Sequence, residues 1–171
     1  MLAALFMMSL QIKGQNMALT TKQQALVAIA ANEAKGDLEQ LRASLNKGLD
    51  NGLTVSEAKE ALSHLYAYTG FPRSLNALGI LQQVIKERAE AGLRTDEGNE
   101  AAPLPKEYDA LKQGTEVQTK LCGGKPFTYT FAPQTDYYLK AHLFGDIFAR
   151  NNLSFADREV VTVSAISANR R

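Results

Sequence analysis

A helix that stops and restarts at one Gly-Phe-Pro sequence is the feature that most constrains this chain. Residues 52–78 read GLTVSEAKEALSHLYAYTGFPRSLNAL. Thr54, followed three residues later by Glu57, has the form of a capping box, in which each side chain satisfies a backbone N–H of the first helical turn. Gly70 can take the left-handed conformation that ends a helix, and Pro72 suits the first turn of a new one. Two helices should therefore meet at a fixed corner.

Apolar residues on both sides of this corner recur at steps of three and four, as on the buried face of a helix. They are Val55, Ala58, Leu62, Leu65, Tyr66 and Thr69 before the corner, and Leu75, Leu78, Leu81 and Ile85 after it. Upstream, Gly36 separates two further amphipathic segments, about residues 22–35 and 38–49, and Asp37 is a suitable N-cap for the second. Four helices with short connections predict an all-α unit whose neighbours pack antiparallel.

Composition excludes several classes of protein. The 171 residues are 45% hydrophobic, enough for one compact domain, and a net charge of +1 gives no electrostatic reason to expect nucleic acid or an anionic membrane as partner. The sole cysteine, Cys122, excludes an internal disulfide and a CxxC redox pair. Two histidines, His64 and His142, argue against a self-contained zinc site, and we predict no metal.

The first sixteen residues, MLAALFMMSLQIKGQN, contain an apolar run whose length suits a secretory signal but not a membrane span. We favour a signal peptide over residues 1–16, although a basic n-region is missing and no small-x-small cleavage site is clear. The alternatives are a buried or trans-packed N-terminal helix, or an upstream extension of a protein that starts at Met17. A signal would place the protein in the periplasm or outside the cell, and a start at Met17 would leave it in the cytoplasm.

The second half of the chain begins with a long connection. Residues 92–135 are polar and rich in Pro and Gly, with a short helix expected near residues 106–113; a loop of this length tends to be functional or mobile. Helix signals then return. Tyr137, Tyr138, His142, Leu143, Ile147 and Phe148 can line one face, and Ser154 precedes a last helix rich in Val and Ile.

Two stretches carry a family resemblance. YAYTGFPRSLNAL (residues 66–78), after GLTVSEAKEAL, resembles the carboxymuconolactone decarboxylase family, relatives of alkylhydroperoxidase D. Residues 18–91 are similar to one whole family repeat, and residues 136–171, including DYYLKAHLFGDIFARNNLSFADREVVTVSAISA, to the start of a second. The resemblance implies an alkylhydroperoxidase D-like helical bundle with one complete repeat, a linker at 92–135 and a truncated second repeat. A repeat cut short should leave apolar surface uncovered, which favours a homo-oligomer, a trimer or hexamer.

The peroxidase branch of this family implies Cys-x-x-Cys-x-x-x-His with a Glu about a helix upstream. There a thiolate attacks the peroxide and a second thiol resolves the sulfenic acid. Asp37, Gln40 and Ser44 align with the two Cys and the His, and Ala25 aligns with the Glu. Because none of these side chains can perform those steps, we expect no thiol peroxidase activity from the first repeat.

The start of the second repeat supplies the two catalytic candidates. Glu159 aligns with the upstream acid of that repeat, and His142 could titrate near neutral pH. The alternative for Glu159 is a surface carboxylate paired with Arg158 or another helix. The alternative for His142 is a packed histidine with a backbone partner.

The decarboxylase branch implies a general acid or base beside a carboxylate-binding pocket. Arg73 could meet a carboxylate through two parallel hydrogen bonds, and Tyr66 or Tyr68 could donate from the same corner. Asn76 is a further candidate for ligand contact, with hydrogen bonding to the backbone of the corner as its alternative. Arg73 could instead hold the corner through a salt bridge or a cap.

Two classes of function therefore stay open. The resemblance implies an enzyme that decarboxylates a lactone acid or reduces peroxides, acting on a small carboxylate or hydroperoxide without cofactor or metal. The missing thiols favour a non-catalytic member, an oligomeric scaffold or a small-molecule binder. A truncated gene product is the third possibility.

Overall fold

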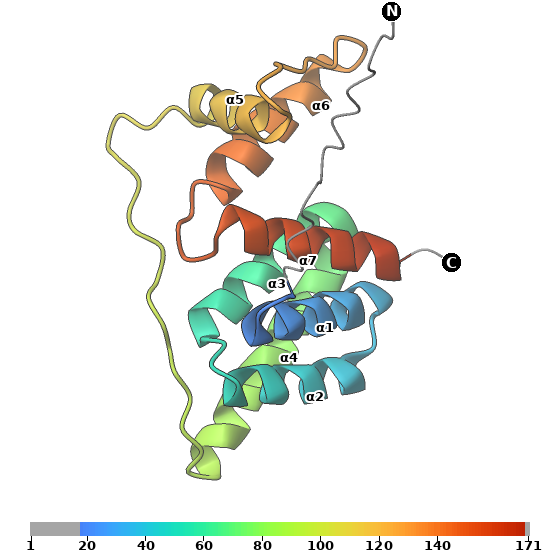
Figure 1. Cartoon of the computed structure of the whole chain (residues 1–171), viewed down its shortest axis with the longest axis vertical. Helices are drawn as coiled ribbons and strands as arrows, with labels where there is room; N and C mark the ends of the chain where they lie inside the picture. Colours follow the sequence, from blue (N-terminus) through green and yellow to red (C-terminus); the bar gives the residue numbers. More distant parts are fainter. Residues whose placement is uncertain (1–17, 170–171) are drawn as a thin grey trace, which may run out of the picture.

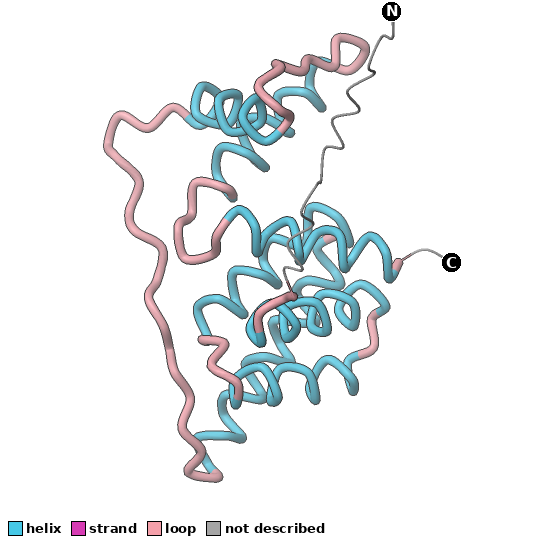
Figure 2. Tube along the Cα trace, viewed as in Figure 1, coloured by secondary structure: helices cyan, strands magenta, loops and turns pink. Residues whose placement is uncertain are grey.

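The structure is a computed structural model that describes residues 18–169, and in this part of the chain the regular secondary structure is all helical, without a strand (Figures 1 and 2). One bundle contains the helices labelled α1 to α4 together with α7. A smaller unit of α5, α6 and η1 lies at one end of the bundle, and an extended segment runs along one side to reach it. The expected signal peptide lies outside the described residues. None of the described helices is long and apolar enough to cross a membrane.

The first four helices follow the sequence signals closely. They are α1 (Thr21–Lys35), α2 (Leu38–Asp50), α3 (Val55–Thr69) and α4 (Phe71–Glu90). Thr54 and Glu57 form the expected capping box at α3, and Asp37 caps α2 by accepting from the backbone N–H of Gln40. Gly70 forms the corner with φ 85° and ψ 155°, so its positive φ is combined with an extended ψ and not with the left-handed helical ψ that we expected. The corner itself is confirmed.

The second half contains α5 (Ala110–Leu121), α6 (Pro133–Tyr137), η1 (Tyr138–Ile147) and α7 (Phe155–Ala168). The short helix expected near residues 106–113 begins later and is longer. η1 is a π-helix, which periodicity at 3.6 residues per turn does not predict. It packs closely on α5 because Gly114 and Gly145 face the partner backbone: a Cβ at Gly114 would overlap the carbonyl oxygen of Lys140.

The extended segment between α4 and α5 docks on the start of α3. The backbone N–H groups of Val55 and Ser56 donate to the carbonyl oxygens of Asp96 and Glu97, at 2.9 and 3.0 Å. These are N–H groups of the first helical turn, which have no partner inside a helix. At Gly98, with φ 68°, a Cβ would overlap the side chain of Thr54. The segment is thus fixed to the bundle by backbone hydrogen bonds.

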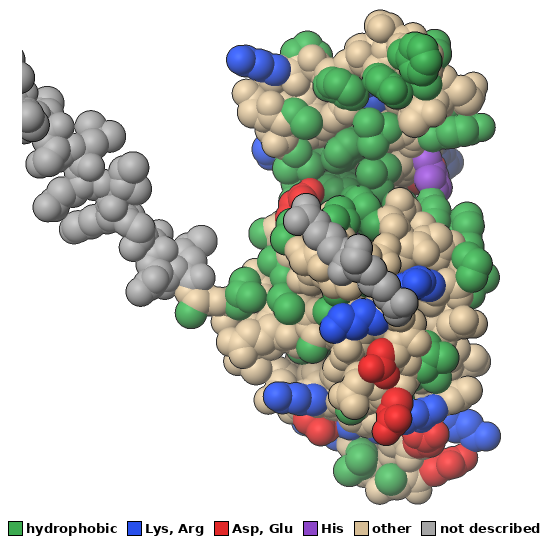
Figure 3. Space-filling view, turned by 90° about the vertical axis from the view of Figure 1, so that its right-hand side faces the viewer, with side chains coloured by type: hydrophobic (Ala, Val, Ile, Leu, Met, Phe, Trp, Pro, Cys, Tyr) green, Lys and Arg blue, Asp and Glu red, His purple; other side chains and the backbone are tan. Residues whose placement is uncertain are grey.

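Leucine, isoleucine, valine and alanine side chains of α1 to α4 and α7 form one core. Its fully buried members include Leu26, Ile29, Leu41, Leu45, Leu62, Leu65, Leu81 and Val161. Figure 3 shows further hydrophobic side chains gathered at the constriction between the bundle and the smaller unit.

A buried ion pair joins α3 to α7 inside this core. Arg158 is 0% exposed and Glu60 is 3% exposed. The Nη2 of Arg158 donates to Glu60 Oε1 at 2.8 Å and to the carbonyl oxygen of Arg150 at 2.7 Å, while Arg150 Nε donates to Glu60 Oε2 at 2.8 Å. The guanidinium of Arg158 also lies 5.6 Å from the ring centroid of Phe148. Each carboxylate oxygen of Glu60 therefore accepts a hydrogen bond from an arginine, Oε1 from Arg158 and Oε2 from Arg150.

We expect Glu60→Gln to lower the free energy of unfolding by about 3–5 kcal/mol, because it leaves the Arg158 charge buried without its carboxylate. Urea denaturation followed by circular dichroism measures this. The matched control is Glu87→Gln, which breaks the exposed pair with Arg42 and should cost no more than about 1 kcal/mol. Equal effects of the two substitutions would contradict the structural role of the Glu60–Arg158 pair.

Candidate functional site

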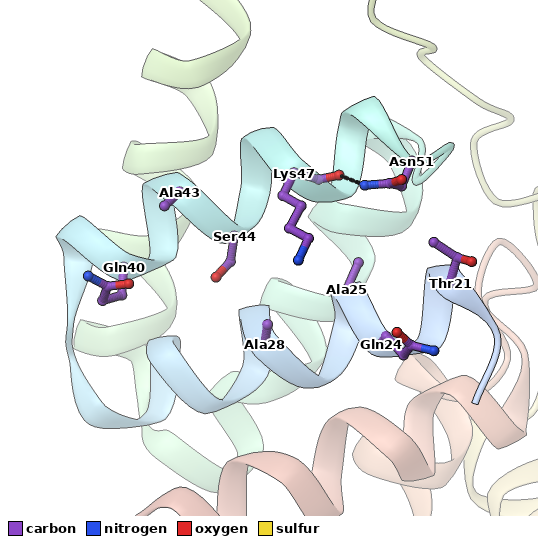
Figure 4. Close-up of a pocket in the computed structure, with 9 residues that line it drawn as sticks. All are labelled: Thr21, Gln24, Ala25, Ala28, Gln40, Ala43, Ser44, Lys47 and Asn51. Atoms are coloured by element: carbon purple, nitrogen blue, oxygen red, sulfur yellow. Dashed lines mark hydrogen bonds between the residues drawn. The ribbon is translucent and has the colours of Figure 1, made fainter. Parts of the chain in front are cut away.

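A cavity of about 290 Å³ lies between α1 and α2 (Figure 4). Its lining consists of alanines together with amide, hydroxyl and ammonium groups: Thr21, Gln24, Ala25, Ala28, Gln40, Ala43, Ser44, Lys47 and Asn51. The two helices lie close together at Gly48, where a Cβ would be 3.3 Å from the Cβ of Ala25. Small side chains on both helices leave the cavity open beside this contact.

Lys47 and Ser44 give this cavity its polar character. The side chain of Lys47 extends from α2 toward α1 (Figure 4). Among the described residues no carboxylate forms a salt bridge with its ammonium group. Ser44 Oγ accepts a hydrogen bond of 2.9 Å from Asn32 Nδ2, so its own proton is free to donate. A positive charge and neutral donors thus share one small space.

Three positions singled out by the family resemblance meet here. Ala25, Gln40 and Ser44, which align with the Glu, one Cys and the His of the peroxidase branch, all line the cavity. Asp37, aligned with the other Cys, caps α2 instead. No thiol, imidazole or carboxylate occurs among the nine lining residues. The cavity can bind an anion but has no group for thiol chemistry.

Arg73 lies near a buried carboxyl group on α1. Glu33 is 1% exposed and its Oε1 accepts a hydrogen bond of 2.7 Å from Thr69 Oγ1. Burial raises the pKa of Glu33, and the hydrogen bond from Thr69 and the charge of Arg73 oppose this. Arg73 Nη1 is buried without a hydrogen-bond partner among the described residues. This environment fits a role for Arg73 in holding the corner as well as the predicted ligand contact.

The other three residues predicted to bind substrate have different surroundings. Tyr66 stacks on Phe71, with ring centroids 4.2 Å apart, whereas Tyr68 lies 5.2 Å from the ring of His64. Asn76 is exposed on α4. Tyr66 and Tyr68 point to different faces of α3, because they are two residues apart on a helix. Neither tyrosine lines a cavity together with Arg73 among the five cavities of the described residues.

The two predicted catalytic residues are both exposed. Glu159 lies on α7, where its charge is one of the causes that raise the pKa of Tyr68, after burial. His142 lies on η1 and its Nδ1 is 2.8 Å from Asp146 Oδ2, so its partner is a carboxylate one helical turn away and not the backbone. Its ring centroid is 5.7 Å from that of Tyr66. Neither residue reaches the cavity between α1 and α2, and their catalytic roles stay predictions.

His64 on α3 is fully buried. Its Nε2 lies 2.9 Å from Thr162 Oγ1. Burial and then the nearby Arg158 charge lower the pKa of His64 to about 3. Glu60 and His64 on α3 are four residues apart, and so are their partners Arg158 and Thr162 on α7. This equal spacing is the sequence signal that could have revealed the burial of His64.

Comparisons with known proteins gave two matches. Residues 2–83, just under half of the chain, match the model of the Carboxymuconolactone decarboxylase family. One relative is the 4-carboxymuconolactone decarboxylase of Acinetobacter baylyi (strain ATCC 33305 / BD413 / ADP1), which is 36% identical over 63 residues. The match covers 37% of this chain and 47% of the relative, so the chain spans about half the length of the protein it matches.

The buried neutral His64 predicts a loss of stability in acid. Its pKa falls from 6.5 to about 3 on folding, so below pH 6.5 the unfolded chain binds a proton that the folded chain does not. The free energy of unfolding should decrease as the pH falls from 6.5 toward 3, with a contribution from this group of up to about 1.4 kcal/mol per pH unit.

Urea titrations at a series of pH values measure this slope. Subtracting the His64→Gln profile from that of the unsubstituted chain cancels the carboxyl groups common to both. The exposed His142→Gln should leave the slope unchanged. A parallel pair of profiles for His64→Gln and the unsubstituted chain would show that His64 is protonated in the folded protein.

Proposed function

We propose that the chain binds a small carboxylate in the cavity between α1 and α2, with Lys47 as its charged contact. One observation carries this proposal: positions 25, 40 and 44, which the family resemblance associates with chemistry, converge on a single cavity that also contains a lysine. The match of residues 2–83 to the model of the carboxymuconolactone decarboxylase family supports a carboxylate as ligand. So does the relative, whose name specifies a carboxylated lactone.

The donors are suited to a carboxylate. Lys47 provides a point charge with three N–H donors, and the hydroxyl of Ser44 and the amide of Gln40 provide neutral donors on the same face of α2. Ala25 and Ala28 offer apolar contact for the rest of the molecule. A volume of about 290 Å³ limits the ligand to a small acid.

A second candidate function is decarboxylation in the same cavity, and the lysine favours it. When the bond to the carboxylate carbon breaks, CO₂ leaves and the electron pair stays on the substrate carbon. That carbon must then be protonated, and the ammonium of Lys47 is the one charged proton donor among the lining residues. We propose no peroxide reduction here, because the chain has a single cysteine and it lies in the linker.

We expect Lys47→Gln to weaken binding of cis,cis-muconate by tenfold or more, because the substitution removes the charge and keeps a polar side chain of similar length. Isothermal titration calorimetry measures the affinity, and release of CO₂ from 4-carboxymuconolactone reports decarboxylation. Lys47→Arg keeps the charge and should bind within a few-fold of the unsubstituted chain. Lys59→Gln, which removes an exposed lysine outside the cavity, should have no effect.

Arg73 at the corner and Glu159 on α7 provide the contrasting result. If Arg73→Ala or Glu159→Gln abolishes binding while Lys47→Gln does not, the ligand lies at that residue and the cavity between α1 and α2 is not the site. Unchanged affinity in all three variants would reject both assignments.

A further inference from the structure

A second cavity, of about 320 Å³, lies where α3 and α4 meet the end of η1. It is separate from the cavity between α1 and α2 and shares none of its residues. Its lining is mostly apolar with a few polar groups: Glu60, Ser63, His64, Tyr66, Phe71, Ser74, Leu75, Leu78, Ile147 and Arg150. A concave apolar space with few polar atoms is typical of a small-molecule site.

The apolar walls come from α4 and η1. Phe71 and Leu75 are 60% and 62% exposed, which is high for side chains of their size, while Ile147 is buried. Leu78 is half-buried. A ring that enters this space would cover apolar surface that the chain itself leaves in contact with water.

Two lining residues carry buried polar atoms without partners. The hydroxyl of Tyr66 and the Nδ1 of His64 have no hydrogen-bond partner among the described residues. Buried polar groups in folded proteins are almost always bonded, so each such atom requires an explanation. His64 is already held through Nε2 by Thr162, whereas Tyr66 is held by ring contacts with Phe71 and His142 that do not involve its hydroxyl. Tyr66 is therefore the lining residue whose hydrogen-bonding group is wholly unused.

The charges at this cavity favour an uncharged ligand. Both oxygens of Glu60 are bonded to arginines, and Arg150, the only cationic residue of the lining, uses its Nε for Glu60. The lining therefore contains one carboxylate and one guanidinium, paired with each other, and carries no net charge. A neutral ligand leaves this balance unchanged, whereas a carboxylate would add a negative charge.

We propose that this cavity binds a small neutral aromatic compound with one hydroxyl group, a phenol. The ring packs against Leu75, Leu78 and Ile147, and the phenolic hydroxyl hydrogen-bonds to the hydroxyl of Tyr66. A phenol can both donate and accept in such a bond, and so can the tyrosine.

Fluorine NMR on the full chain tests this with three probes of similar size: 4-fluorophenol, fluorobenzene and 4-fluorobenzoate. We expect 4-fluorophenol to bind most tightly. Tyr66→Phe should weaken its binding about tenfold, to the level of fluorobenzene, because a hydrogen bond of about 1 kcal/mol or slightly more is lost. Tyr68→Phe is the matched control, since this neighbouring tyrosine is not in the lining, and it should leave the affinity unchanged.

Two further variants locate the probe. Leu78→Trp fills the cavity and should abolish binding, whereas Leu111→Trp, on the exposed face of α5, should not. Circular dichroism checks whether Leu78→Trp folds. If it does not fold, Tyr66→Phe, which removes one oxygen atom, still tests the proposal. Lys47→Gln should leave 4-fluorophenol binding unchanged. The test of this cavity is therefore independent of carboxylate binding in the cavity between α1 and α2.

Equal affinity for 4-fluorophenol and fluorobenzene would overturn the proposal, as would unchanged 4-fluorophenol binding in Tyr66→Phe. Tighter binding of 4-fluorobenzoate that survives Lys47→Gln and is lost in Leu78→Trp would show that the cavity takes an anion instead, which also contradicts it.

Discussion

The buried pair between Glu60 and Arg158 is the interaction on which the rest of the structure depends. It joins residues almost a hundred positions apart, and α7 runs in the same direction as α3 along a contact that continues from His64 to Thr162. A charge buried this deeply is stable only with its partner and its hydrogen bonds in place. Because Arg158 also binds the carbonyl of Arg150, the pair holds the residues that follow η1 against α3. Glu60 and Arg150 both line the second cavity, so the pair also shapes its wall.

The cavity between α1 and α2 depends on a different constraint, the size of side chains at a helix contact. Gly48 and Ala25 let the helices approach closely, and the alanines beside them leave a space that larger residues would fill. The scaffold thus contains a cavity at this place, and its side chains offer an ammonium, a hydroxyl and an amide. The proposed binding of an anion rests on these groups, whereas any catalysis there requires Lys47 to act as the proton donor.

Local signals made the first half of the fold predictable. Capping residues at Thr54 and Asp37 and the break at Gly70 act within one or two turns, so the sequence alone locates these helix ends. The π-helix η1, the docking of residues 96 and 97 on α3 and the burial of Arg158 depend on contacts between distant segments, which periodicity does not reveal. Gln40 and Ser44, which align with the family motif, line the cavity between α1 and α2, although the sequence predicted no cavity there and pointed to the corner instead. Lys47 was missed because a lysine on a helix suggests a solvated face, although it is three residues after Ser44 and shares its side of α2.

Hydrogen exchange of the full chain, followed by mass spectrometry, tests most directly whether α7 belongs to the core through Arg158. In the unsubstituted chain the amides of α7 should exchange as slowly as those of α1 and α3, and more slowly than those of α5 and η1. In Glu60→Gln the α7 amides should lose protection more than those of α2 and α4. Rapid exchange of α7 in the unsubstituted chain, with α1 to α4 still protected, would contradict the account.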